Sequence, residues 1–216
     1  MRFLSYMIVF LFGVIIDATD YQSLVKEVKW TDIITALATI VTTIVVYVTY
    51  SKWLESKKRE DAYQTSKNYI SCLVNISDLL GELMYPFDVC VPQEGSMVIN
   101  RDQSNSLLAN SNEAIHKLIT KAKELARIKS ELSFWNVRLA PELERNHNKL
   151  LQAISNVVVV ADVLQKQVVW FYNVEENHLN AISNEFNKLK DRVSVAEVLL
   201  SLIYSRKYEG CFIYGK

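Results

Sequence analysis

The residue types that most often carry chemistry in proteins are few and widely spaced in this chain. Its three histidines are His116, His147 and His178, and each has one glutamate three residues before it (Glu113, Glu144 and Glu175) but no second histidine at the three- or four-residue spacing of helical metal sites. A metal or catalytic site needs converging ligands, and no H-E-x-x-H or similar grouping is present. We therefore predict no metal site, and we interpret His147, which lies on an apolar seam, as a core or interface residue.

The cysteines and glycines likewise show no pattern of a catalytic or cofactor-binding site. The three cysteines, Cys72, Cys90 and Cys211, are odd in number and include no C-x-x-C pair, so we interpret them as reduced, mostly structural thiols. No nucleophile motif surrounds them. Five scattered glycines cannot form a phosphate-binding loop. The sequence therefore predicts a protein that is not an enzyme and that uses no cofactor.

The amino-acid composition further restricts the fold and function classes that fit this chain. The 24 basic and 24 acidic residues leave no net charge to attract nucleic acid, so no direct nucleic-acid binding is predicted. Apolar residues make up 50% of the 216 residues and are concentrated in the first fifty positions. Five glycines and three prolines are too few for the tight turns of a sandwich or barrel. We expect an all-α protein with one soluble domain of ordinary size.

The clearest membrane signal is the stretch 33–50, IITALATIVTTIVVYVTY, which contains no charged residue. It is long enough to cross a hydrocarbon core of roughly 30 Å. Trp30 and Trp53 bracket it, as aromatic anchors at a membrane interface do. We predict a transmembrane helix over 31–53. The alternative, a buried core helix of a soluble protein, would require neither the aromatic brackets nor the charge run that follows.

An earlier apolar segment, 3–16, begins directly after Arg2 and is shorter. It fits a short transmembrane helix over 1–18, and it also fits a cleaved signal peptide, although the sequence around Ala18 is a poor cleavage site. We favour the helix. With a short external loop over 19–30, the two spans then form a transmembrane hairpin.

The distribution of basic residues predicts the orientation. The stretch from Asp17 to Asp32 holds two lysines and four acidic residues, whereas a basic cluster follows the second span at Lys52, Lys57, Lys58 and Arg59. Because basic residues remain on the cytoplasmic side, residues 51–216 should face the cytosol. We interpret the mixed run from Glu55 to Asp61 as a solvated helix face and not as a specific lipid site, with contact of its first basic residues with anionic headgroups as the alternative.

Small polar residues follow one face of the second span, at Thr31, Thr35, Thr39 and Thr43. A stripe of small residues lets a neighbouring helix approach closely, and the hydroxyls can bond across the contact. We therefore predict that the second span associates either with the first span of the same chain or with other copies of the chain. We expect the protein to be a homo-oligomer. Two alternatives remain: the stripe could line a water-filled pore, or each threonine is merely tolerated because its hydroxyl bonds its own backbone.

Beyond the membrane, apolar residues repeat at alternating steps of three and four residues, which predicts four helices in an antiparallel bundle over 54–216. The four seams run between Tyr69 and Leu83, Leu108 and Leu132, Leu143 and Phe171, and Leu179 and Ile203. The run 157–160, VVVV, keeps the helical period on both sides, so we interpret it as helix and not strand.

Three boundaries in this body follow from local signals. The first seam stops at Pro86, and 85–104 is predicted to be an irregular loop suited to partner contact or disorder. Ala140-Pro141-Glu142 predicts a helix start, with proline tolerated in the first turn. Nothing between 173 and 180 breaks the helical pattern, so the third and fourth helices could be one.

The C-terminal tail, 204–216, mixes basic and aromatic residues. Such a mixture suits a membrane surface or a protein groove. The alternative is an end strand or coil packed on the bundle.

The stretch from Trp30 to Tyr63 resembles the membrane segment of many small bacterial proteins: a Trp-x-Asp entry, an Ala/Thr/Ile/Val span, a Tyr/Trp exit and a Lys-rich helix. With the short preceding span and the helical body, the layout is similar to the two-transmembrane effectors of bacterial anti-phage systems. These include effectors that partner retron reverse transcriptases and two-span effectors associated with nucleotide-signalling modules.

The resemblance implies a toxin-like effector of the bacterial inner membrane, held silent until infection and then disrupting that membrane so that the infected cell stops growing. It implies as partners the lipid bilayer and a cytosolic regulatory complex of a reverse transcriptase with its RNA–DNA product. No catalytic residues carry over from such a family. The competing interpretation from the residues is a membrane-anchored adaptor, whose bundle binds a partner protein while the spans only tether it.

Overall fold

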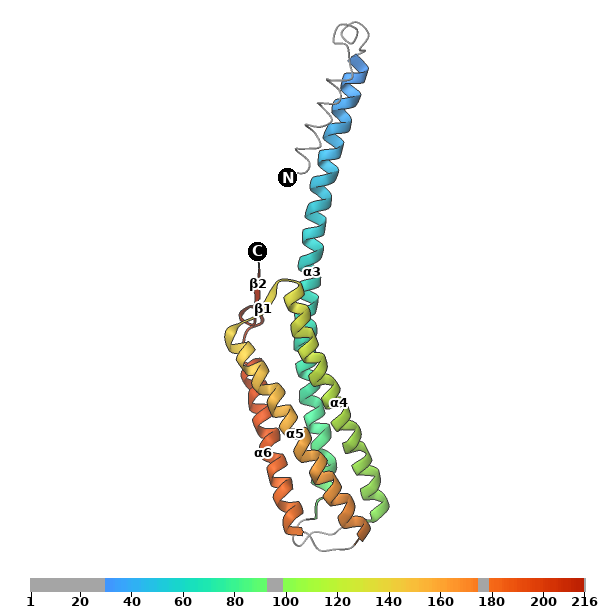
Figure 1. The fold of residues 1–216 in the computed structure, drawn as a ribbon, viewed down its shortest axis with the longest axis vertical. Coiled ribbons are helices and arrows are strands. Elements are labelled where there is room, and N and C mark those ends of the chain that lie inside the picture. The colour runs from blue at the N-terminus through green and yellow to red at the C-terminus, as the bar shows by residue number, and fades with distance from the viewer. Residues whose placement is uncertain (1–29, 93–98, 175–178, 216) are drawn as a thin grey trace. The chain divides into compact units, whose positions relative to one another are not determined.

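The computed structural model describes residues 30–92, 99–174 and 179–215. Over these residues the chain is almost wholly helical, which confirms the predicted all-α class with an apolar helix towards the N-terminus. The predicted first span at 1–18 and most of the loop after it lie outside the described residues. The described helices are α3 (Trp30–Cys90), α4 (Arg101–Phe134), α5 (Pro141–Val174) and α6 (Leu179–Tyr204) (Figure 1).

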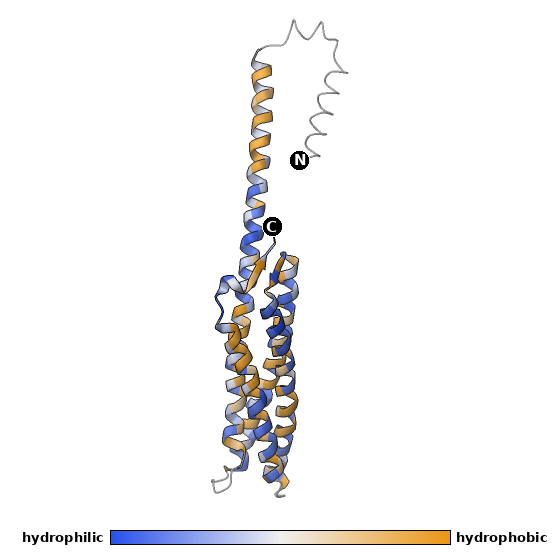
Figure 2. Cartoon of the chain, turned by 90° about the vertical axis from the view of Figure 1, so that its left-hand side faces the viewer, coloured by the Kyte–Doolittle hydropathy of each residue, from blue (hydrophilic) through white to orange (hydrophobic). Residues whose placement is uncertain are grey.

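The chain divides into two compact units, residues 1–57 and 58–216. In the first unit, the described residues belong to the beginning of α3, where the side chains from Ile33 to Leu54 are all exposed. In Figure 2 the ribbon of this stretch is coloured mostly hydrophobic, and a hydrophilic segment follows it along the helix. No protein core covers these apolar side chains within the described residues.

The second unit is an antiparallel bundle built from the remainder of α3 with α4, α5 and α6 (Figure 1). The predicted seams supply its core, and each of the four helices buries its own stripe. Fully buried members of the seams include Leu73, Leu80, Leu118, Leu125, Leu150, Val157, Leu189 and Ala196. Each large apolar side chain removed from water in this way contributes roughly 1.5–3 kcal/mol, so the seams are the main source of stability of the bundle.

The first helix continues through Pro86 to Cys90, so the predicted stop at Pro86 was wrong. Proline removes one backbone donor from a helix, but tertiary contacts offset this loss. Phe87 and Cys90 are fully buried in the core, and Tyr172 of α5 donates a hydrogen bond to the Cys90 carbonyl at 2.9 Å. Burial of the residues that follow Pro86 therefore outweighs the local signal.

The predicted irregular stretch 85–104 is also too long at its other end, because α4 begins at Arg101. Asn100 is the N-cap, and its side-chain oxygen accepts a hydrogen bond from the Gln103 backbone N–H at 2.8 Å. Asparagine is among the best residues at this position because it satisfies a backbone donor that the helix leaves free. Residues 93–98 lie outside the described ranges.

The third and fourth helices are separate, so the interpretation as one continuous helix was wrong. Helix α5 begins at Pro141, as predicted, with Glu142 and Glu144 in its first turn. It contains the run 157–160, which confirms the helical interpretation. Helices α5 and α6 run in opposite directions beside each other (Figure 1), which lets both apolar seams face the same core.

Two short strands that the sequence did not predict lie at one end of the bundle. β1 (Val137–Leu139) follows α4 after Asn136, whose φ of 59° is a left-handed conformation that asparagine tolerates. β1 pairs antiparallel with β2 (Phe212–Tyr214), and a 3-10 turn, η1 (Tyr208–Gly210), precedes β2. The tail is thus an end strand packed on the bundle, one of the two alternatives for it.

Candidate functional site

The membrane-spanning candidate is the apolar half of α3. Its helix is long and apolar enough to cross a membrane, and none of the apolar window is buried in the protein. Exposed large side chains follow all of its faces, among them Ile34 (63% exposed), Val41 (58%) and Val46 (61%). Leaving such a helix in water is unfavourable, because each Å² of apolar surface exposed to water costs roughly 25 cal/mol of free energy.

Helix α5 also passes the test of length and composition for a membrane span. Its apolar residues, however, form a stripe, and Leu150, Val157 and Leu164 on that stripe are completely buried in the bundle. Charged residues such as Asp162 and Lys166 pair with each other on its exposed face. This arrangement is typical of the core helix of a bundle.

The threonine stripe of α3 has its hydroxyl groups turned to its own backbone. Thr35 donates to the Thr31 carbonyl at 2.7 Å, Thr39 to the Thr35 carbonyl at 2.8 Å and Thr43 to the Thr39 carbonyl at 2.8 Å. Each hydroxyl donor is therefore satisfied within the helix, as one of the sequence alternatives held. The helix then presents the methyl groups of a small-residue face and no unsatisfied hydroxyl donor on those three residues.

The stripe has a further member that the four-residue spacing missed. Thr42 follows Thr35 by seven residues, and residues seven apart on a helix lie only about 20° apart. Its hydroxyl donates to the Ala38 carbonyl at 2.8 Å, like the others. A helical projection of the sequence would have found it.

The predicted interface anchors and basic cluster all lie on α3. Trp53 is 58% exposed and its ring lies 5.9 Å from that of Tyr50, so two amphipathic rings meet at one end of the apolar stretch. The side chain of Trp30 lies outside the described residues. The cluster of Lys52, Lys57, Lys58 and Arg59 is exposed and follows Trp53 closely in sequence.

A buried polar pair joins two helices of the bundle. The Tyr69 hydroxyl and Nδ1 of His147 are hydrogen bonded at 2.9 Å, and both residues are almost completely buried. Phe212 of β2 covers the Tyr69 ring edge-to-face at 5.9 Å. The predicted core role of His147 is thus confirmed, and its partner lies 78 residues away in sequence, beyond the reach of any local pattern.

The environment of this pair keeps both groups neutral. Burial, together with the nearby Lys129, lowers the pKa of His147 to about 4, although Glu144 opposes the shift. Burial also raises the pKa of Tyr69 far above its usual value. At neutral pH the pair is therefore an uncharged hydrogen bond, which suits a structural role and not proton transfer.

The cysteines are buried and free. Burial raises the pKa of Cys72 to about 11, and it also raises the pKa of Cys90 and of Cys211. Because the thiolate is the reactive form, all three thiols are poor nucleophiles at neutral pH.

The described residues contain no group of three or more His, Cys, Asp or Glu side chains that could hold a metal ion. His116 is exposed beside Glu113 and Lys117 in a surface groove between α3 and α4. His178 lies outside the described residues.

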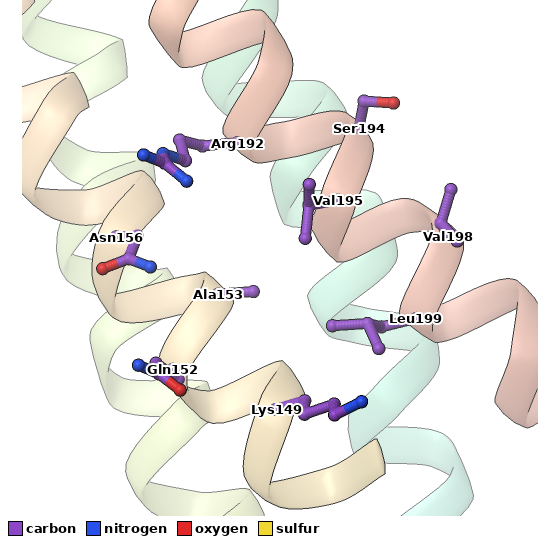
Figure 3. A pocket seen from close by; sticks show the side chains of 9 residues that line it. All are labelled: Lys149, Gln152, Ala153, Asn156, Arg192, Ser194, Val195, Val198 and Leu199. Carbon is purple, nitrogen blue, oxygen red and sulfur yellow. The ribbon is translucent and has the colours of Figure 1, made fainter.

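A second surface groove, of about 440 Å³, runs between α5 and α6 (Figure 3). Lys149 and Arg192 lie on its two walls, and Val195, Val198 and Leu199 give it an apolar side. Its nine lining residues include no carboxylate, histidine or cysteine. The groove therefore has the character of a contact surface and lacks the groups that acid–base or metal chemistry needs.

No protein-family model matches the chain, and comparisons with curated proteins and with solved structures found no match. The apolar half of α3, a candidate membrane span, and the surface of the bundle are thus the features from which a function must be inferred.

Proposed function

We propose that the chain is a membrane-embedded effector of a bacterial anti-phage system, such as a retron, which disrupts the inner membrane on activation. The observation that carries the proposal is the charge-free helical stretch from Ile33 to Tyr50, which is exposed on all faces and precedes a folded bundle. Such a surface requires a lipid environment or a partner helix. The anti-phage context comes from the resemblance of the whole layout to such effectors, with residue-level likeness confined to Trp30 to Tyr63.

In this proposal the bundle faces the cytosol, where the regulatory complex would act on it. The basic cluster after Trp53 supports this orientation, because basic residues flanking a span remain on the cytoplasmic side. The lethal step belongs to the spans. The small-residue face of Thr35, Thr39 and Thr42 supports it, because such a face lets spans of several copies pack closely.

The experiment is expression of the full chain alone in bacteria, with growth and the membrane potential followed by a potential-sensitive dye. We expect depolarisation, and we expect the double substitution Thr35→Leu and Thr39→Leu to relieve it, because leucine keeps the helix apolar but removes its close-packing face. The matched control is Val41→Leu with Val48→Leu, which enlarges β-branched residues on the opposite face and should leave depolarisation intact.

The second candidate is a membrane-anchored adaptor, and one observation favours it. The hydroxyls of Thr35, Thr39 and Thr43 all bond to their own helix, so they are engaged without any neighbouring span. A tether needs nothing more. Normal growth and a normal membrane potential at high expression, with the chain still recovered in the membrane fraction, would favour the adaptor over the effector.

A further inference from the structure

The end of the bundle that carries the two strands exposes a large aromatic ring. Phe134, the last residue of α4, is 79% exposed, the largest fraction among the large apolar side chains that the structure describes. Its ring stands edge-to-face on Trp135, at 5.0 Å, and Trp135 packs against the core. The ring is thus held outward by a fixed support.

The two strands at the same end of the bundle also expose their outer face. Arg138 of β1 lies directly opposite Ile213 of β2, and both are exposed, while Leu139 and Phe212 beside them are buried. This alternation is that of a ladder with one face on the core and one in solvent. The Gly215 N–H donates to the Asn136 carbonyl at 2.8 Å, which joins the tail to the end of α4.

Two basic residues of this region have no carboxylate partner. Arg138 and Lys207 are exposed and form no ion pair within the part of the chain that the structure describes. Their neighbours differ, since Arg206 pairs with Glu142 and Lys129 pairs with Glu144 at 2.8 Å. Exposed apolar side chains with unpaired cations among them are the composition of a surface that binds anionic lipid. We call Phe134, Arg138, Lys207 and Ile213 the end surface.

The C-terminal tail, which carries Lys207 and Ile213 of the end surface, packs on the part of α3 that follows the proposed span in sequence. The tail packs on α3 through Tyr208, whose ring lies 5.6 Å from that of Tyr63, and through Tyr214, whose hydroxyl donates to Ser66 at 3.2 Å. Tyr63 follows the anchor Trp53 by ten residues. Ten residues span at most about 35 Å even when fully extended.

We propose that the end surface docks on the anionic headgroups of the bilayer, with Phe134 and Ile213 at the headgroup boundary and Arg138 and Lys207 against phosphate groups. This inference rests on the proposed membrane anchoring. A bilayer fits better than a protein partner because a stable protein interface needs about 800 Å² from each side, far more than four side chains supply. A tethered surface needs less area, since the tether raises the effective concentration of the bilayer.

The test replaces Phe134 with the photo-crosslinking analogue p-benzoyl-L-phenylalanine in the full chain. The protein is reconstituted in vesicles of phosphatidylethanolamine and phosphatidylglycerol, irradiated and analysed by mass spectrometry. We expect an adduct of one phospholipid on the segment containing residue 134. The matched control carries the analogue at Tyr85, which is 63% exposed in α3 and lies 22 residues beyond Tyr63, and it should give almost no lipid adduct.

The electrostatic part has its own variants. Arg138→Gln and Lys207→Gln should each lower the adduct yield about fivefold, since one basic residue near an anionic surface contributes roughly that factor. Lys123→Gln, an exposed lysine in the middle of α4, should leave the yield unchanged. Vesicles of phosphatidylcholine alone should lower the yield of the unsubstituted sequence.

Three outcomes would overturn the docking: a crosslink from position 134 to a second copy of the chain, equal lipid adducts at 134 and 85, or no adduct at either position. Alkaline carbonate extraction of the same vesicles separates these from failure of the proposed function. Release of the chain into the supernatant contradicts membrane anchoring, whereas retention of the chain without an adduct contradicts the docking alone.

Discussion

The apolar half of α3 and the whole of α5 are both helical stretches rich in valine, yet they bury very different fractions of their surface. In α5 the apolar side chains fall on one seam, and Leu150 and Val157 are completely buried. In α3 they surround the helix, and Val41 and Val46 are both more than half exposed.

The difference teaches that the distribution of apolar residues, and not their number, separates the core helix from the candidate membrane span. A seam at steps of three and four leaves a polar face for water, where Asp162 and Lys166 pair. A stretch that is apolar on every face leaves none, so its surroundings must themselves be apolar. Each prediction below substitutes or titrates one side of this comparison.

The largest effect is expected from a carboxylate placed in the seam of α5. Val157→Asp should lower the free energy of unfolding of the bundle by more than about 4 kcal/mol, because the charge is buried without a partner. Val159→Asp, two residues on and 61% exposed, should change it by less than about 0.5 kcal/mol. Urea denaturation of the full chain in detergent, followed by circular dichroism, measures both. Equal effects would contradict the seam.

The next effect concerns two valines of α3 that are both exposed but face different surroundings in our proposal. Val41→Lys should disfavour membrane insertion by about 3 kcal/mol, whereas Val74→Lys, 45% exposed in the bundle, should have no effect on insertion. Alkaline carbonate extraction of membranes from cells that express each variant provides the measurement. Loss of the Val74→Lys variant from the membrane, or full retention of Val41→Lys, would count against the predicted span.

Much of the fold was predictable from the sequence because the spacing of apolar residues along each helix follows the helical period. The seams from Tyr69 to Leu83 and from Leu108 to Leu132 follow the helical period, and the structure buries most of their members. Pro141 marked the start of α5 correctly, because proline at the first helical position needs no local partner.

The features that the sequence analysis missed depend mostly on contacts between distant residues. The helix passes Pro86 because Phe87 is buried by the bundle, and β1 exists because residues 212–214 pair with it. The Tyr69–His147 hydrogen bond likewise joins two helices. Asn100 is different, since Asn-x-x-Gln before an apolar seam was a readable capping signal.

The smallest effect is a pH dependence of the bundle, which the apolar half of α3, free of titratable groups between Ile33 and Val46, should not share. His147 has a pKa of about 4 in the folded protein and near 6.5 when unfolded. Between these values the unfolded chain binds the extra proton, so stability is lost as pH falls. From pH 7 to pH 5 the loss should be about 2 kcal/mol, at 1.36 kcal/mol for each pKa unit.

Because carboxylates titrate in the same range, the informative quantity is the difference between the natural sequence and His147→Gln. Urea denaturation at pH 7, 6 and 5 should show a steeper fall for the natural sequence, with the two curves separating by about 2 kcal/mol at pH 5 relative to pH 7. Parallel curves would mean that His147 exchanges protons with solvent as easily when folded as when unfolded. The hydrogen bond to Tyr69 would then not keep the His147 ring neutral in the core. Water would reach that part of the seam more easily than its burial indicates.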